Sequence, residues 1–153
     1  MADYLEGIAV TKVAEGLAVE RAAALPPQTA TEDLFRIEGG RVLLKQIVGE
    51  VTDNIGAVAN NTKLEVNPDD AAAGDLCNVL NITGDVAGTL YGITGTPANN
   101  MFDSITVLAA QATPVILKEG AIELTCAASS VTGAIKWTVI YVPIDKGAYI
   151  AAA

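Results

Sequence analysis

The chain has 153 residues, with 18 acidic side chains, nine basic ones and no histidine, so its formal net charge is −9. Without histidine there is no serine–histidine–aspartate triad, no cysteine–histidine dyad and no imidazole-ligated zinc. A chain this acidic repels phosphate backbones and anionic lipid, so we expect neither nucleic acid nor membrane among its partners. Its length is that of one domain with its own core.

The charge is unevenly distributed along the chain. Residues 50–85 hold seven acids and one base, a net −6, whereas residues 86–153 hold four acids and three bases, a net −1. The acidic segment is typical of a solvated face. The nearly neutral C-terminal half is typical of a protein interface, although a core has the same composition.

Residues 1–33 differ from the rest of the chain. Ile8 and Val10 suggest a short extended segment, and the pair Pro26-Pro27 cannot continue a helix. We expect an extended N-terminal arm or linker at 1–33, followed by a β-rich domain at 34–153. The alternative is an edge strand followed by a loop.

Two β-rich runs, 34–37 and 41–48, flank Gly39-Gly40 and predict a hairpin. Residues 114–117 and 121–126 around Lys118-Glu119-Gly120 predict a second hairpin. Gly49 is expected to mark a bulge or bend. Short helices are expected over residues 71–80 and 100–109, although a strand from Ser104 competes with the second.

The clearest β pattern covers residues 134–143, where Ile135, Trp137, Val139 and Tyr141 share one face. The other face is also largely apolar, so this strand is expected to be buried on both sides. Several strands at short, turn-punctuated spacing predict a mainly β fold, an antiparallel sandwich or small barrel with one or two short helices.

No pattern in the sequence supports chemistry. Cys77 and Cys126 are expected to be buried small hydrophobes, with one disulfide as the alternative. Asp69, Asp70 and Asp75 could hold calcium, but their spacing fits a solvated acidic loop better. We therefore expect no catalytic, cofactor-binding or metal-ligating residue and no enzyme activity. The acidic start of the chain and the lack of a long apolar run predict neither a signal peptide nor a membrane span.

Five segments resemble small β-rich virion proteins encoded among the head genes of tailed bacteriophages. The resemblance covers roughly residues 34–153. The segments are 34–42 (LFRIEGGRV), 49–52 (GEVT), 90–96 (LYGITGT), 120–124 (GAIEL) and 132–138 (TGAIKWT).

The resemblance implies a head decoration, or cement, protein. Such a protein binds the major capsid protein on the outer surface of the assembled head, usually as a homotrimer, after synthesis in the host cytoplasm. The arm would contact the capsid through Tyr4, Leu5, Ile8 and Val10 by strand addition. The oligomer surface would include Phe35, Tyr91, Met101 and Phe102.

Two other functions fit the sequence less well. A tail or head–tail connector component would form a ring-shaped oligomer. A carbohydrate-binding module would use Trp137 or Tyr91 as a stacking surface, although a tryptophan among strand hydrophobics is more often part of a core.

Overall fold

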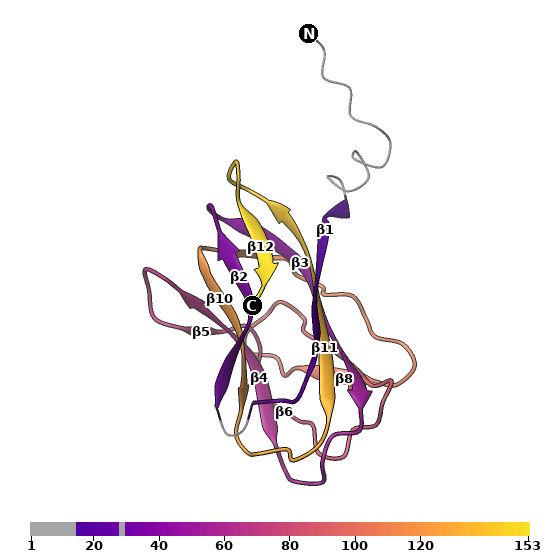
Figure 1. The fold of residues 1–153 in the computed structure, drawn as a ribbon. Helices are drawn as coiled ribbons and strands as arrows, with labels where there is room; N and C mark the ends of the chain where they lie inside the picture. Colours follow the sequence, from indigo (N-terminus) through magenta and orange to yellow (C-terminus); the bar gives the residue numbers. More distant parts are fainter. Residues whose placement is uncertain (1–14, 28–29) are drawn as a thin grey trace.

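The computed structural model describes residues 15–27 and 30–153, which form two antiparallel sheets packed face to face (Figure 1). We name each sheet after a central strand. The β3 sheet contains, in spatial order, β1 (Leu17–Ala24), β11 (Ala134–Pro143), β3 (Val42–Asp53), β7 (Leu90–Gly92) and β8 (Phe102–Ser104), with β9 (Val115–Leu117) also paired to β3. The β10 sheet contains β12 (Tyr149–Ala152), β2 (Thr31–Glu38), β10 (Gly120–Cys126), β4 (Asn61–Pro68) and β5 (Gly74–Asp75), with β6 (Leu80–Asn81) also paired to β4. The prediction of a mainly β antiparallel sandwich is confirmed.

The inner faces of the two sheets form one hydrophobic core. On β11, burial alternates along the strand as predicted, and the residues Ile135, Trp137, Val139 and Tyr141 are buried. The opposite face of β11 is half-buried, so the prediction of burial on both sides is confirmed only in part. No helix among the described residues is long and apolar enough to cross a membrane.

Gly49 pairs in regular register with Trp137 on β11 and with Tyr91 on β7, so the predicted bulge is not at this position. A Cβ at Gly49 would lie 2.8 Å from Cζ3 of the Trp137 ring. Gly49 is therefore required because the indole covers its backbone, and the irregularities between β3 and β11 fall elsewhere.

Neither predicted hairpin forms. The strands of the first expected hairpin belong to different sheets, β2 to the β10 sheet and β3 to the opposite sheet. The strands of the second are also separated, because β10 lies in the β10 sheet and β9 pairs with β3 in the other. Gly39 and Gly40, with φ of 79° and 133°, carry the chain from one sheet to the other. A Cβ at Gly39 would lie 2.3 Å from the carbonyl oxygen of Gly147, so the β2–β3 and β11–β12 connections touch at this point. The glycine pair, without side chains, leaves room for the two connections to approach each other closely.

Both predicted helices are wrong. Residues 71–80 contain β5 and enter β6, and residues 100–109 contain β8. Leu76 and Cys77 are buried as neighbours, and the backbone amide of Leu76 donates to the carbonyl of Leu64. Pairing with β4 thus provides the hydrogen bonds that a helix would have made internally.

Within the range expected to form an arm, Leu17–Ala24 form edge strand β1, which pairs along β11 from Leu17 opposite Tyr141 to Ala24 opposite Ile135. β2 begins at Thr31, before the expected domain start at Leu34. The edge strand of the alternative is therefore present at Leu17–Ala24. Residues 1–14 lie outside the described residues.

Candidate interaction surfaces

The residues expected at the oligomer surface lie mainly in the core. Phe35, Tyr91 and Met101 are buried, and Phe102 is half-buried. They are therefore not exposed for contact with a second chain, apart from part of Phe102. The arm residues Tyr4, Leu5, Ile8 and Val10 lie outside the described residues.

Trp137 and Tyr91 pack against each other inside the sandwich. Their ring centroids are 6.2 Å apart, and the Tyr91 hydroxyl donates to Asp85 at 2.6 Å. Burial and this hydrogen bond raise the pKa of Tyr91 above its ordinary value. Because both rings are covered, neither offers the exposed stacking surface that a carbohydrate-binding module requires.

The two cysteines are free and buried, as the sequence predicted. Burial raises the pKa of the Cys77 thiol to about 11, and it also raises the pKa of Cys126. The thiolate is the reactive form of cysteine, so neither side chain is prepared for nucleophilic chemistry at neutral pH. No group of three or more metal-ligating side chains that could hold an ion occurs within residues 15–27 and 30–153.

An acidic row crosses the outer face of the β10 sheet. Asp33 on β2 is opposite Glu123 on β10, Glu123 is opposite Glu65 on β4, and Glu65 is opposite Asp75 on β5. Lys63 pairs with Glu65 at 2.7 Å and with Asp75 at 2.6 Å. Glu123 is buried and accepts a hydrogen bond from Asn67 at 3.0 Å, so the charge that this row presents to solvent comes from the other three carboxylates, less the one that Lys63 balances.

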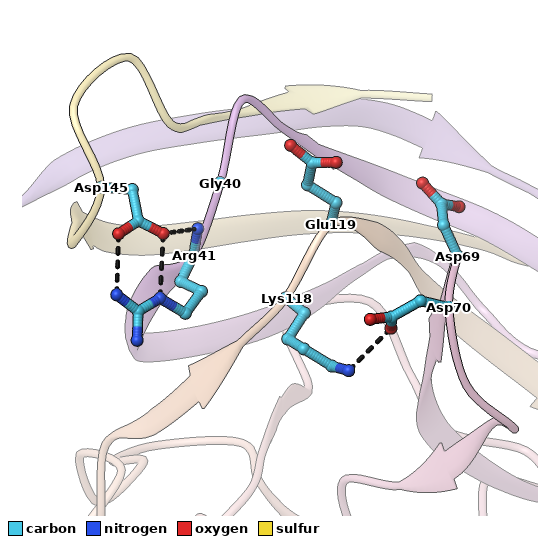
Figure 2. Close-up of a pocket in the computed structure, with 7 residues that line it drawn as sticks. All are labelled: Gly40, Arg41, Asp69, Asp70, Lys118, Glu119 and Asp145. Atoms are coloured by element: carbon cyan, nitrogen blue, oxygen red, sulfur yellow. Dashed lines mark hydrogen bonds and ion pairs between the residues drawn. The ribbon is translucent and has the colours of Figure 1, made fainter.

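A charged hollow of about 280 Å³ lies at one end of the sandwich, where connections from both sheets meet (Figure 2). The Arg41 guanidinium holds Asp145 through two hydrogen bonds of 2.9 and 2.8 Å, and the Arg41 backbone amide adds a third of 2.7 Å. Lys118 donates to Asp70 at 2.7 Å. Arg41 and Lys118, the two cations of the hollow, are thus each neutralised by a carboxylate. Both ion pairs join residues from different connections at this end of the sandwich.

The Arg41–Asp145 pair predicts a specific pH dependence of stability. Hydrogen bonds from Arg41 lower the pKa of Asp145. A carboxyl whose pKa is depressed by folding adds stability above its unfolded pKa of about 3.9 and loses that contribution as the pH falls through the folded value. Asp145→Asn should therefore lower the free energy of unfolding at pH 7, and the gap from the wild type should close as the pH falls below about 4.

Urea unfolding at a series of pH values measures this gap. Asp70→Asn is the matched control, because Asp70 lies on the same rim and accepts one hydrogen bond from the Lys118 side chain in place of the two from the Arg41 guanidinium. It should show a smaller gap at pH 7. A gap for Asp145→Asn that stays constant from pH 7 to pH 2 would contradict the prediction.

The third surface is apolar and lies on the part of the β3 sheet around β7, β8 and β9, whereas the same sheet carries Lys136 with Glu20 and Glu50 farther along. Only Asp103 is charged among residues 86–117. On this face Val48 is opposite Gly92, and Leu43 is opposite Ile116. The exposed fractions are 61% for Ile105, 79% for Val107 and 64% for Ile116. We call Ile105, Val107 and Ile116, together with the half-buried Leu43 and Val48, the uncharged surface.

The connection between β8 and β9 is fastened to this sheet. The Gln111 backbone amide donates to the Gln46 side chain at 2.7 Å, and the Gln111 amide group donates to the Leu44 carbonyl at 3.3 Å. The Leu108 side chain reaches within 3.0 Å of the place a Cβ would take at Gly92. The β8–β9 connection, which carries these apolar side chains, is therefore held in place against β3.

The sequence prediction missed Ile105, Val107 and Ile116 as surface residues, because helix-like spacing placed Ile105 and Leu108 in an expected helix. The signal that could have identified them is the absence of charge from 104 to 117 in a chain with 18% charged residues. No family model, curated protein or solved structure matches the chain.

Proposed function

We propose that the chain is a non-catalytic virion protein that binds the assembled major capsid shell of a tailed phage and stabilises the head. The observation that carries this proposal is the uncharged surface, three exposed aliphatic side chains held rigidly on a sandwich that is otherwise strongly acidic. Exposed apolar clusters with polar surroundings mark contact surfaces between proteins. The resemblance of residues 34–153 to phage head proteins supports the choice of partner.

The acidic row gives the opposite face a distinct role in this proposal. Asp33, Glu65 and Asp75 face solvent on the β10 sheet, with Glu123 buried between them, whereas the uncharged surface lies on the β3 sheet. Negative potential facing the solvent would keep neighbouring particles apart. The sandwich would thus use its apolar side for assembly and its acidic side for solvation.

The N-terminal arm would add contacts to the capsid. Tyr4, Leu5, Ile8 and Val10 precede β1 in the chain. Addition of an extended segment to a capsid strand would supply main-chain hydrogen bonds, with alternate side chains filling pockets. Repetition over a symmetric shell multiplies such contacts.

Co-sedimentation with assembled heads tests the proposal. The full chain should pellet with intact heads at a fixed copy number and should not bind unassembled capsid protein to the same extent. Failure to pellet with the heads overturns the proposed function. A ring-shaped oligomer that binds only the head–tail junction would favour the connector alternative instead.

The arm is tested separately by deleting residues 2–14, because β1 from Leu17 onward belongs to the sheet. The deletion should weaken head binding by more than about tenfold while leaving the unfolding midpoint unchanged. Replacing Tyr4, Leu5, Ile8 and Val10 by serine keeps the chain length and should have the same effect. Undiminished binding by both variants would show that the arm makes no capsid contact.

A further inference from the structure

We propose that the edge of β11 is an exchangeable strand-binding site and that β1 is its resident, releasable occupant. The inference does not depend on head binding. Among the described residues β1 pairs with β11 alone, so its release would leave the backbone groups along one side of β11 free to pair with another strand. An extended peptide that took this place would gain main-chain hydrogen bonds along the β11 edge.

β1 contributes little to the hydrophobic core. Four of its eight residues are alanines, and none of its residues is fully buried. The inward side chains Leu17 and Val19 are half-buried and pack against the core from its margin. Elements that bury little apolar area open at a lower free energy than the core on which they rest. Release of β1 should therefore require less free energy than unfolding of the sandwich.

The third inward position of β1 holds a charged residue. Arg21 is opposite the buried Trp137, so its side chain points toward the interior of the sandwich. This side chain is 13% exposed, and its Nε is buried without a hydrogen-bond partner among the described residues. A buried donor without a partner raises the free energy of the closed state. Arg21 thus holds β1 in place less firmly than an apolar side chain would.

One ion pair offsets part of this cost and joins the two sheets beside β1. The Arg21 guanidinium donates to the Glu32 carboxylate of β2. Glu32 is opposite the buried Leu124 of β10, so it faces the interior as well. β12 pairs with β2 only from Glu38 to Phe35, and its pairing stops short of Glu32. The Arg21–Glu32 pair therefore closes the part of this edge that β12 leaves open, and it breaks whenever β1 leaves.

The sequence of β1 shows which chemistry the β11 edge accepts. Leu17, Val19 and Arg21 are successive inward positions, whereas the residues between them are exposed. A competing strand would run antiparallel to β11 and carry two aliphatic side chains at alternate positions, followed by a basic one that meets Glu32. The partner that fits this site is therefore an extended peptide with the pattern aliphatic–x–aliphatic–x–basic.

Amide hydrogen exchange of the full chain, followed residue by residue with NMR, measures the release. The amides of β11 alternate between the ladder with β1 and the ladder with β3, so a single strand contains both the probe and its control. We expect the amides bonded to β1 to exchange at least about tenfold faster than those bonded to β3. Equal protection of the two sets would overturn the proposal.

Two variants should shift the release in opposite directions. Glu32→Gln leaves Arg21 without its counter-ion and should speed exchange of the β1-bonded amides by about fivefold or more. Arg21→Met removes the unpaired donor, keeps an unbranched side chain and should slow that exchange by a similar factor.

Glu20→Gln is the matched control for these variants. Glu20 also lies on β1, but it is exposed and reaches Lys136 only at 3.9 Å. Its replacement should leave the exchange of the β11 amides unchanged. The same acceleration in Glu20→Gln as in Glu32→Gln would overturn the role assigned to the ion pair between the sheets.

A fluorescein-labelled peptide with the sequence of residues 15–25 tests whether the vacated edge accepts another strand. It is added to the full chain at up to about 1 mM, because the attached β1 competes at a high effective concentration. We expect a saturable rise in anisotropy, faster in the wild type than in Arg21→Met, and none for a peptide with serine in place of Leu17 and Val19. Absence of saturable binding by the unaltered peptide would overturn the strand-binding site. Neither measurement involves heads, so failure here leaves the proposed function standing.

Discussion

Trp137→Ala is expected to lower the free energy of unfolding by about 3–5 kcal/mol, the range found when a large aromatic side chain is removed from a core. Trp137 is 1% exposed, stacks on Tyr91 with the centroids 6.2 Å apart, and covers the backbone of Gly49. Alanine would leave a cavity beside a glycine, which has no side chain to fill it. Because domains of this kind have a total stability of about 5–15 kcal/mol, the variant should lie close to unfolding at 37 °C.

Trp137→Phe separates the loss of the ring from the loss of the indole nitrogen. The Trp137 Nε1 is buried and has no hydrogen-bond partner among the described residues. Phenylalanine keeps a ring over Gly49 and removes this unpaired donor, so its cost should be below about 1.5 kcal/mol. Urea unfolding followed by far-ultraviolet circular dichroism measures both variants without relying on tryptophan fluorescence. Equal losses for the two variants would contradict the role assigned to the ring.

The strands and the core could be predicted from local sequence because their signal is local. Alternation along β11 identified the inward residues, and burial agrees with it at Trp137 and Tyr141. The assignment of strands to sheets could not be predicted in the same way. A Gly-Gly pair between two β-rich runs has the same composition whether it turns within a sheet or crosses to the other one, and here Gly39 and Gly40 cross.

The candidate surface was only partly predictable, for a similar reason. A neutral C-terminal half indicated an interface or a core, and the structure shows that it contributes to the core and also leaves apolar side chains exposed. Tyr91 and Met101 come from this half and are buried, whereas Val107 and Ile116 are exposed. Periodicity could not separate them, because residues 105–114 belong to a connection without a regular repeat. Their exposure is decided by long-range contacts such as that of Gln111 with Gln46.

Gly95→Ala is expected to have the second large effect on stability. Gly95 has a φ of +88°, and a Cβ there would lie 1.8 Å from the carbonyl oxygen of Thr113. The strained backbone alone costs about 1–3 kcal/mol, and the overlap forces Thr113 to move. Since Thr113 precedes β9 and ends the connection that carries Val107, the uncharged surface should lose its fixed shape.

Gly84→Ala supplies the control for this prediction, because Gly84 also has a positive φ, +68°, but a Cβ there would meet nothing within 4 Å. Its cost should be the backbone strain alone. The difference in unfolding free energy between the two variants, measured by urea unfolding, therefore gives the cost of displacing Thr113. Equal losses for Gly95→Ala and Gly84→Ala would contradict the role assigned to the close approach of Gly95 and Thr113.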